Sequence, residues 1–140
     1  TVRTFTTEVL DLIETRMRAV AEHTSAAYGA RCEFSFQRNY PPTINHTDET
    51  DFVRQVMTEV VGADNVLDFE PTMGAEDFSY YLQEKPGAYF LIGNGDGTHR
   101  EGGHGLGPCM LHNPSYDFND QLIPLGATLW VKLVQRWLVS

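Results

Sequence analysis

Two consecutive prolines, Pro41 and Pro42, constrain the fold of this chain more than any other feature. Proline has no backbone N–H and its ring fixes φ, so neither a helix nor a central strand can run through the pair. The chain must therefore divide here. We predict three parts: residues 1–40, a hinge over residues 41–46, and residues 47–140.

The first part has the pattern of a strand, a helix and a second strand. Residues 2–5 alternate apolar and polar side chains, as a half-buried strand does. Thr6 and Thr7 can cap a helix whose apolar side chains recur at three- and four-residue spacing, and Gly29 can close it. Residues 31–37 alternate again. This order predicts an α/β fold, with a small strand-helix-strand unit before the hinge.

The second part continues the mixture of helices and strands. A helix beginning at Thr47 carries acidic residues in its first turn, and Gly62 ends it. Proline suits the first turn of the last helix, where Pro124 lies. Between these two helices the pattern predicts a strand over 65–69, a helix from 76 or 77 to about 83, a strand over 88–92 and a glycine-rich loop over 93–108.

Composition excludes several classes of partner. The chain has 140 residues and a formal net charge of −9, which argues against binding to nucleic acid or an anionic membrane. No apolar run approaches the roughly 20 residues of a membrane span. The first residues are amphipathic and acidic, unlike a signal peptide. Two cysteines make no disulfide framework, so we expect a cytoplasmic protein, and a start at Thr1 suggests a piece of a longer one.

His112 is the first candidate for a metal ligand. It follows a glycine-rich stretch and precedes a helix that we expect near Asn119. Neutral imidazole is the commonest nitrogen ligand of zinc and similar ions. Asn113 and Asp117 could orient the ring from behind. On pattern alone the alternative, a surface histidine in a turn, is the more frequent case.

Four further residues are candidates for substrate contacts. Glu76 and Asp77 form an acidic pair after Gly74, and their alternative role is to satisfy backbone N–H groups at a helix start. Arg3 and Arg38 lie on or beside the predicted strands of the first part. The planar guanidinium suits a substrate carboxylate, but each arginine could equally be a solvated surface charge.

A local structural zinc site is a separate possibility. His104, Cys109 and His112 have the spacing His-x4-Cys-x2-His, which offers three ligands without an obvious fourth. The alternatives are a flexible glycine loop for His99 and His104, and a small buried side chain for Cys109. The chain has no phosphate-binding loop, no Gly-x-Ser-x-Gly motif and no dinucleotide fingerprint.

Five blocks resemble the metal-dependent amidohydrolase and peptidase family, which contains aminoacylases, hippurate hydrolase, carboxypeptidase G-type enzymes and the plant indole-acetyl–amino-acid hydrolases. The blocks are TVRTF (1–5), YPPTIN (40–45), GAEDF (74–78), IGNG (92–95) and LHNPxYDFND (111–120). They occur in the family's order and span almost the whole chain. The resemblance is greatest to the branch of hippurate hydrolase.

The resemblance implies a part of a longer, two-domain enzyme. Its catalytic α/β domain holds two divalent metal ions (Zn, Mn, Co or Ni), and an inserted lid mediates dimerisation. Residues 1–40 would be the second half of the lid, and residues 47–140 the C-terminal part of the catalytic domain. His112 matches a metal ligand of the family. The residues that match its substrate-binding positions are Arg3, Arg38, Asn45, Gly74, Glu76 and Asp77.

The implied function is metal-dependent hydrolysis of the amide bond of N-acyl, hippurate-like amino acids by a metallo-amidohydrolase. The remaining metal ligands and the general-base glutamate would precede Thr1, so this chain would hold no catalytic residue and would be inactive alone. Its partners would be a small-molecule N-acyl amino acid and a second copy bound through the lid. The alternative is a non-catalytic binding or dimerisation module.

Overall fold

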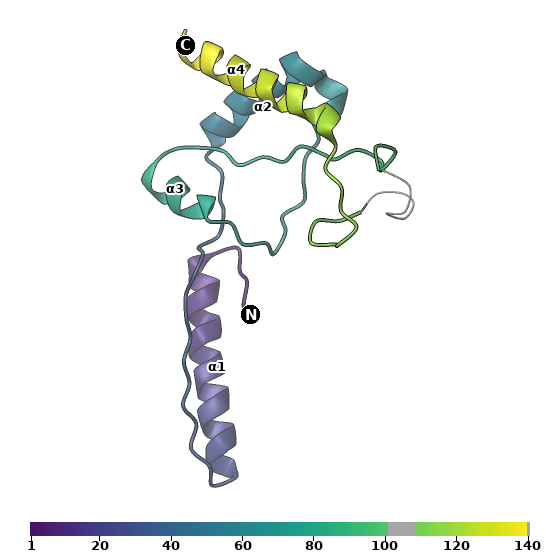
Figure 1. The fold of residues 1–140 in the computed structure, drawn as a ribbon. Coiled ribbons are helices and arrows are strands. Elements are labelled where there is room, and N and C mark those ends of the chain that lie inside the picture. Colours follow the sequence, from purple (N-terminus) through teal and green to yellow (C-terminus); the bar gives the residue numbers. More distant parts are fainter. Residues whose placement is uncertain (101–108, 140) are drawn as a thin grey trace. The chain divides into compact units, whose positions relative to one another are not determined.

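This computed structural model describes residues 1–100 and 109–139. Every element of regular secondary structure in these ranges is a helix (Figure 1). The α-helices there are α1 (Thr7–Ala27), α2 (Thr47–Val61), α3 (Phe78–Glu84) and α4 (Ile123–Trp137). Two 3-10 helices, η1 (Ala63–Asn65) and η2 (Asp120–Leu122), complete the set in these ranges. No helix in the described ranges has both the length and the apolar composition needed to cross a membrane.

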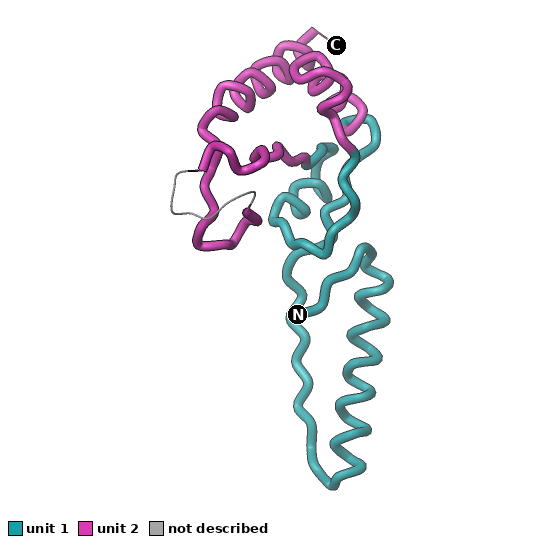
Figure 2. The backbone as a smooth tube through the Cα atoms, turned by 90° about the vertical axis from the view of Figure 1, so that its right-hand side faces the viewer, with its two compact units in different colours: residues 1–49, 68–89 teal, residues 50–67, 90–140 magenta. Residues whose placement is uncertain are grey.

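The chain divides into two compact units (Figure 2). The first unit contains residues 1–49 and 68–89, and thus α1, α3 and the proline pair. The second contains residues 50–67 and 90–140, and thus most of α2 together with α4. Each unit is described separately below.

Both ends of α1 follow from local sequence signals. The Thr6 hydroxyl accepts a hydrogen bond from the Val9 amide at 3.2 Å, which satisfies one of the unpaired donors of the first turn. At the other end Gly29 adopts φ +66°, a conformation that glycine reaches without strain. The amides of Gly29 and Ala30 then bond to the carbonyls of Ala26 and Ser25, which is a Schellman motif. Of the two predicted caps, Thr6 takes this role and Thr7 is the first helical residue. The predicted stop at Gly29 is confirmed.

The predicted α/β fold, with its strand-helix-strand lid half, is wrong. Within the described ranges no segment forms a strand, including residues 2–5, 31–37, 65–69 and 88–92. An alternating pattern predicts an extended backbone, but a sheet also needs a neighbouring extended backbone that exchanges N–H and C=O bonds. These segments find no such neighbour among the described residues.

Residues 31–37 keep the conformation and the alternation without the sheet. The segment runs back alongside α1, as both views show (Figures 1 and 2). Three side chains are half-buried, and the four that alternate with them are exposed. The Arg18 guanidinium on α1 lies 4.7 Å from the centre of the Phe34 ring and donates to the Phe34 carbonyl at 3.4 Å. A side chain of α1 therefore contacts this segment where a sheet would have a second strand.

The rest of the first unit is organised by α3. Its buried residues are Ser79 and Leu82. The Ser79 hydroxyl donates to the Glu76 carbonyl at 2.6 Å, which fixes the chain just before the helix. A Cβ at Gly87 would lie 3.2 Å from the Leu82 Cδ2, so glycine allows the strand-like segment that follows to approach α3.

The second unit has a small core between α2 and α4. Val56, Leu129 and Leu133 are buried, and half-buried side chains surround them. Phe52 packs edge-on against Trp137, with ring centroids 5.5 Å apart. Fully burying a leucine side chain contributes roughly 1.5–3 kcal/mol, so each of the two buried leucines stabilises the unit by an amount of this order. The two helices match the predicted ones, and Pro124 lies in the first turn of α4 as expected.

Candidate functional site

His112 lies in a tight turn of the second unit. The Asn113 amide donates to the Met110 carbonyl at 3.3 Å, which makes His112 the third residue of a β-turn. Its φ is +68°, the one positive φ of a non-glycine residue in the described ranges. The side chain is exposed, and within residues 1–100 and 109–139 nothing hydrogen-bonds with the imidazole. A histidine in this left-handed conformation is a backbone outlier of the kind that concentrates at functional sites.

The chain after His112 is held by a second turn. The Tyr116 amide donates to the Asn113 carbonyl at 2.9 Å, and the Asn113 side chain accepts from the Ser115 amide at 2.9 Å. The predicted role of Asn113 behind the imidazole is therefore replaced by a backbone role. Its amide oxygen caps the turn that directs the chain away from His112.

Asn94 clamps the next part of this segment from a different loop. Its Nδ2 donates to the Asp117 carbonyl at 2.7 Å, and its Oδ1 accepts from the Asn119 amide at 2.9 Å. Asn119 in turn accepts from the Gln121 amide and caps η2. The histidine turn is thus anchored on its C-terminal side by a side chain that precedes it in the chain.

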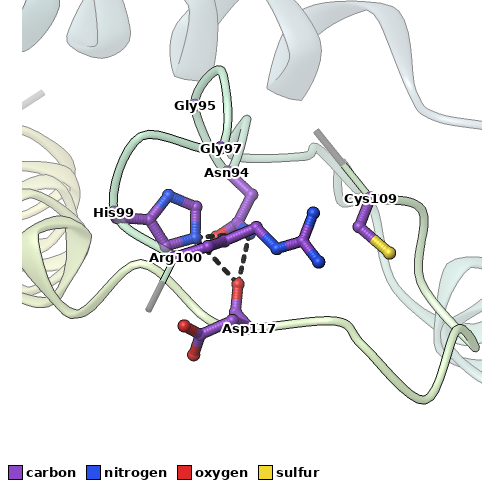
Figure 3. Close-up of a pocket in the computed structure, with 7 residues that line it drawn as sticks. All are labelled: Asn94, Gly95, Gly97, His99, Arg100, Cys109 and Asp117. Atoms are coloured by element: carbon purple, nitrogen blue, oxygen red, sulfur yellow. Dashed lines mark hydrogen bonds between the residues drawn. The ribbon is translucent and has the colours of Figure 1, made fainter. Parts of the chain in front are cut away.

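His99 and Arg100 strengthen this clamp (Figure 3). The Nε2 of His99 lies 2.9 Å from the Asp117 carbonyl oxygen. A carbonyl can only accept, so we assign the ring proton to Nε2. Arg100 donates through Nη2 to the Ser115 carbonyl at 3.0 Å. The earlier alternative for His99, a flexible glycine loop, does not describe it: the side chain is half-buried and hydrogen-bonded.

A small cavity lies beside the clamp. Its volume is about 20 Å³, the space of a water molecule, and it is too small for a substrate. Asp96 lies in the chain between two lining glycines. Its carboxylate accepts from the Thr98 amide at 3.0 Å, and this hydrogen bond holds the pKa of Asp96 below its usual value. The lining residues are Asn94, Gly95, Gly97, His99, Arg100, Cys109 and Asp117.

In the first unit, Asn45 and Glu76 are brought together by Tyr89. The Asn45 side chain donates to the Tyr89 carbonyl and accepts from the Tyr89 amide, both at 2.8 Å. The Tyr89 hydroxyl donates to the Glu76 Oε2 at 3.0 Å. Burial, and then the hydrogen bond to Glu76, raise the pKa of Tyr89 above its usual value, so the phenol remains a donor at neutral pH.

Asp77 and Gly74 are not engaged in this way. Asp77 precedes α3, but its side chain makes no capping hydrogen bond. It is exposed, so the alternative role of a helix-capping acid is not the one that it plays. A Cβ at Gly74 would meet only the Thr72 hydroxyl at an ordinary 3.6 Å, so packing does not require glycine there.

Arg38 is bound to carboxylates of its own chain. Its Nη1 lies 2.6 Å from the Asp11 Oδ1, and its Nε and Nη2 donate to the Glu14 Oε2 at 2.9 and 2.6 Å. Hydrogen bonds to Glu14 and then to Asp11 raise the pKa of Arg38 further. Arg3 is exposed. The two arginines predicted as substrate contacts thus have different surroundings.

The proposed structural zinc site falls partly outside the described residues, because His104 belongs to 101–108. Cys109 is a half-buried free thiol, while His112 is exposed. In the ranges that the structure describes, no group of three or more His, Cys, Asp or Glu side chains could hold a metal ion.

Comparison with known proteins settles the family. The profile of peptidase family M20/M25/M40 matches residues 5–136, almost the entire chain. The chain belongs to this family. The resemblance inferred from the five blocks is confirmed, and with it the assignment to hydrolases and peptidases whose members in general depend on divalent metal ions.

The M20/M25/M40 relatives are much longer than this chain. YhaA of Bacillus subtilis, which carries the name of an amidohydrolase, is 33% identical over 91% of this chain and 31% of its own length. Thermostable carboxypeptidase 1 of Saccharolobus solfataricus is 32% identical over 91% of this chain and 30% of its own. IAA-amino acid hydrolase ILR1-like 4 of Arabidopsis thaliana is 30% identical over 72% of this chain and 22% of its own length. The chain therefore spans about a third of these relatives, or less.

The residues that organise this M20/M25/M40 chain locally were not all evident from its sequence. Asn94 lies in the IGNG block, whose glycines alone had suggested a loop. Tyr89 lies in the apolar run 88–92, whose pattern predicts a buried strand and no role for a hydroxyl. The available signal was chemical: a polar group within an apolar run needs a hydrogen-bond partner.

Proposed function

We propose that the whole protein containing these residues hydrolyses the amide bond of N-acyl, hippurate-like amino acids. The observation that carries the proposal is His112: an exposed imidazole, held in a left-handed turn, in a chain of the M20/M25/M40 family. The substrate class is supported by the plant relatives named as IAA-amino acid hydrolases. A small-molecule substrate follows from this class.

The whole protein would use two divalent metal ions, with Zn, Mn, Co or Ni as candidates. The imidazole of His112 fits one ligand position, because nothing in the described ranges hydrogen-bonds with it and the turn fixes its backbone. The same ranges contain no complete ligand set. We place the remaining ligands and the general-base glutamate before Thr1, and we propose that residues 1–140 alone do not catalyse the reaction.

The chemistry expected of each part is limited. A divalent ion would polarise the amide carbonyl of the substrate. This chain would contribute His112 to hold the ion, while Asn94, His99 and Arg100 keep the segment after the turn in place. Of the predicted substrate-binding positions, Glu76 presents a carboxylate and Arg3 an exposed guanidinium.

Metal content and turnover of the whole protein test this function. We expect about two divalent ions per chain, and His112→Ala should lower both the metal content and the hydrolysis of hippurate. His23→Ala removes an exposed histidine of α1 and is the matched control. A His112→Ala protein with full metal content and full activity would contradict the proposal. So would ordinary turnover of hippurate by the isolated 140-residue chain.

We also propose that the whole protein is a homodimer through α1 and residues 31–38. No residue of α1 is buried, and Leu12 and Val20 are 56% and 65% exposed. Sedimentation velocity should give a dimer, which Leu12→Glu with Val20→Glu should convert to a monomer. Leu138→Glu, which changes an exposed leucine after α4, should leave the dimer intact. A whole protein that is monomeric at all concentrations would contradict this proposal.

A further inference from the structure

Two predicted substrate-binding residues, Asn45 and Glu76, contact the same third residue. Asn45 belongs to the segment after the proline pair, and Glu76 lies just before α3. Tyr89 contacts both: its backbone forms hydrogen bonds with the Asn45 side chain, and its hydroxyl forms one with the Glu76 side chain. All three residues belong to the first unit.

The Asn45 amide is largely used by this contact. Its Nδ2 and Oδ1 each form a 2.8 Å hydrogen bond to the backbone of Tyr89, so the side chain bonds to Tyr89 as the backbone of a strand neighbour would. The next residue extends the pairing, since the His46 amide donates to the Gly87 carbonyl at 3.0 Å. An amide engaged in this way holds Tyr89 in place and would have to break both bonds to turn to a substrate.

The Tyr89 side chain in turn contacts Glu76 from a restricted position. Its ring packs at 5.8 Å against Phe78, which restricts the direction in which the hydroxyl points. The hydroxyl then donates to one carboxylate oxygen of Glu76 at 3.0 Å. A hydrogen bond to a charged group is among the stronger ones in proteins, and it leaves the second oxygen of Glu76 for another partner.

We propose that Tyr89 is a positioning residue that orients the Glu76 carboxylate at the substrate site, and that Asn45 acts through Tyr89 instead of touching the substrate. The inference rests on the proposed function, because it takes Glu76 to face the substrate. It assigns a role to Tyr89, which no motif of the sequence had indicated, and changes the role of Asn45.

The contact itself can be tested without substrate. The ¹³C resonance of the Tyr89 ring carbon that bears the hydroxyl, followed by NMR against pH in the 140-residue chain, reports its pKa. Glu76→Gln should lower the pKa of Tyr89 clearly more than the matched charge removal Asp77→Asn, because Asp77 acts only through its charge. The pKa need not return to its usual value, since burial also raises it. Equal shifts in the two variants would overturn the contact.

The positioning role is tested by kinetics of the whole protein with hippurate. Tyr89→Phe keeps the ring and removes the hydroxyl, and we expect kcat/KM to fall about tenfold, the scale of one such hydrogen bond. Tyr80→Phe is the matched control, because the Tyr80 hydroxyl donates to the Asn39 carbonyl in the same unit. Its kcat/KM should change less than twofold. Equal losses in the two variants would overturn the role of Tyr89.

A double-mutant cycle tests the path through Asn45. If Asn45 acts through the Tyr89 hydroxyl, adding Asn45→Ala to Tyr89→Phe should lower kcat/KM little further. If the double variant instead showed the product of the two single losses in kcat/KM, Asn45 would act on the substrate directly, and its proposed action through Tyr89 would be overturned. A whole protein without activity toward N-acyl amino acids would refute the proposed function and the substrate role of Glu76 together. The titration would still decide whether Tyr89 and Glu76 are coupled.

Discussion

The Asn94 side chain donates a 2.7 Å hydrogen bond to the Asp117 carbonyl, although 23 positions separate the two residues in the chain. The same side chain accepts from the Asn119 amide at 2.9 Å. One asparagine thus fixes the backbone between the His112 turn and η2. Both bonds are partly shielded from water, so their loss would leave backbone groups unsatisfied.

Replacement of Asn94 should therefore destabilise the second unit. We expect Asn94→Ala to lower the free energy of unfolding by about 1–3 kcal/mol, the cost of partly buried polar groups without partners. Urea denaturation of the 140-residue chain measures it. Asn65→Ala is the matched control, because the Asn65 side chain donates to the Val61 carbonyl at an exposed helix end. Losses of the same size in both variants would show that the clamp adds nothing.

The backbone of His112 leads to a second prediction. At φ +68° an ordinary side chain costs roughly 1–2 kcal/mol, whereas asparagine visits this region more readily. His112→Asn should therefore be about 1 kcal/mol more stable to urea than His112→Ala, although both remove the imidazole. Two variants of equal stability would mean that the residue does not need the left-handed conformation.

Local signals were sufficient for the helices. The cap at Thr6 and the stop at Gly29 act within a few residues, so a pattern that spans one helix end contains the whole interaction. The prediction of strands was wrong because a strand depends on residues outside its own segment. Residues 31–37 have the alternation of a strand, but alternation specifies only an extended backbone and its faces. A ladder depends on a second segment, which the pattern does not identify.

The candidate site follows the same rule. His112 could be singled out because its motif is contiguous, and the comparisons confirm the family that the motif indicated. The clamp by Asn94 and the contact between Tyr89 and Glu76 join residues distant in the chain. Neither pairing leaves a local pattern. The sequence motifs identify candidate residues, but only the structure shows which of these residues contact one another.

The core between α2 and α4 should respond to truncation more than the exposed end of α4. Leu129 is 5% exposed and packs on Val56, so Leu129→Ala should cost about 2–5 kcal/mol through lost burial and a residual cavity. Leu138 is 77% exposed, and Leu138→Ala should stay within about 0.5 kcal/mol of the unchanged chain. Urea denaturation compares them directly. Similar costs at both positions would contradict the packing described here.

Arg38 should hold the extended segment 31–37 against α1. Its guanidinium engages the Asp11 and Glu14 carboxylates through three nitrogen atoms, an arrangement that a lysine cannot reproduce. In ¹⁵N relaxation measured by NMR, Arg38→Lys should raise the backbone mobility of this segment, and Arg38→Ala should raise it more. Arg31→Ala, which removes an exposed arginine from the other end of the segment, is the matched control.

Salt separates this pairing from simple packing. Arg38 and Asp11 are exposed and Glu14 is half-buried, so raising the salt concentration should weaken their attraction and bring the mobility of the segment in the unchanged chain closer to that in Arg38→Ala. The mobility of the segment in Arg38→Ala itself should change little, because the attraction is already absent. If salt raised the mobility equally in both, or if Arg31→Ala matched Arg38→Ala, then Arg38 would not hold the segment. It would then be available for the substrate carboxylate that its place in the chain had suggested.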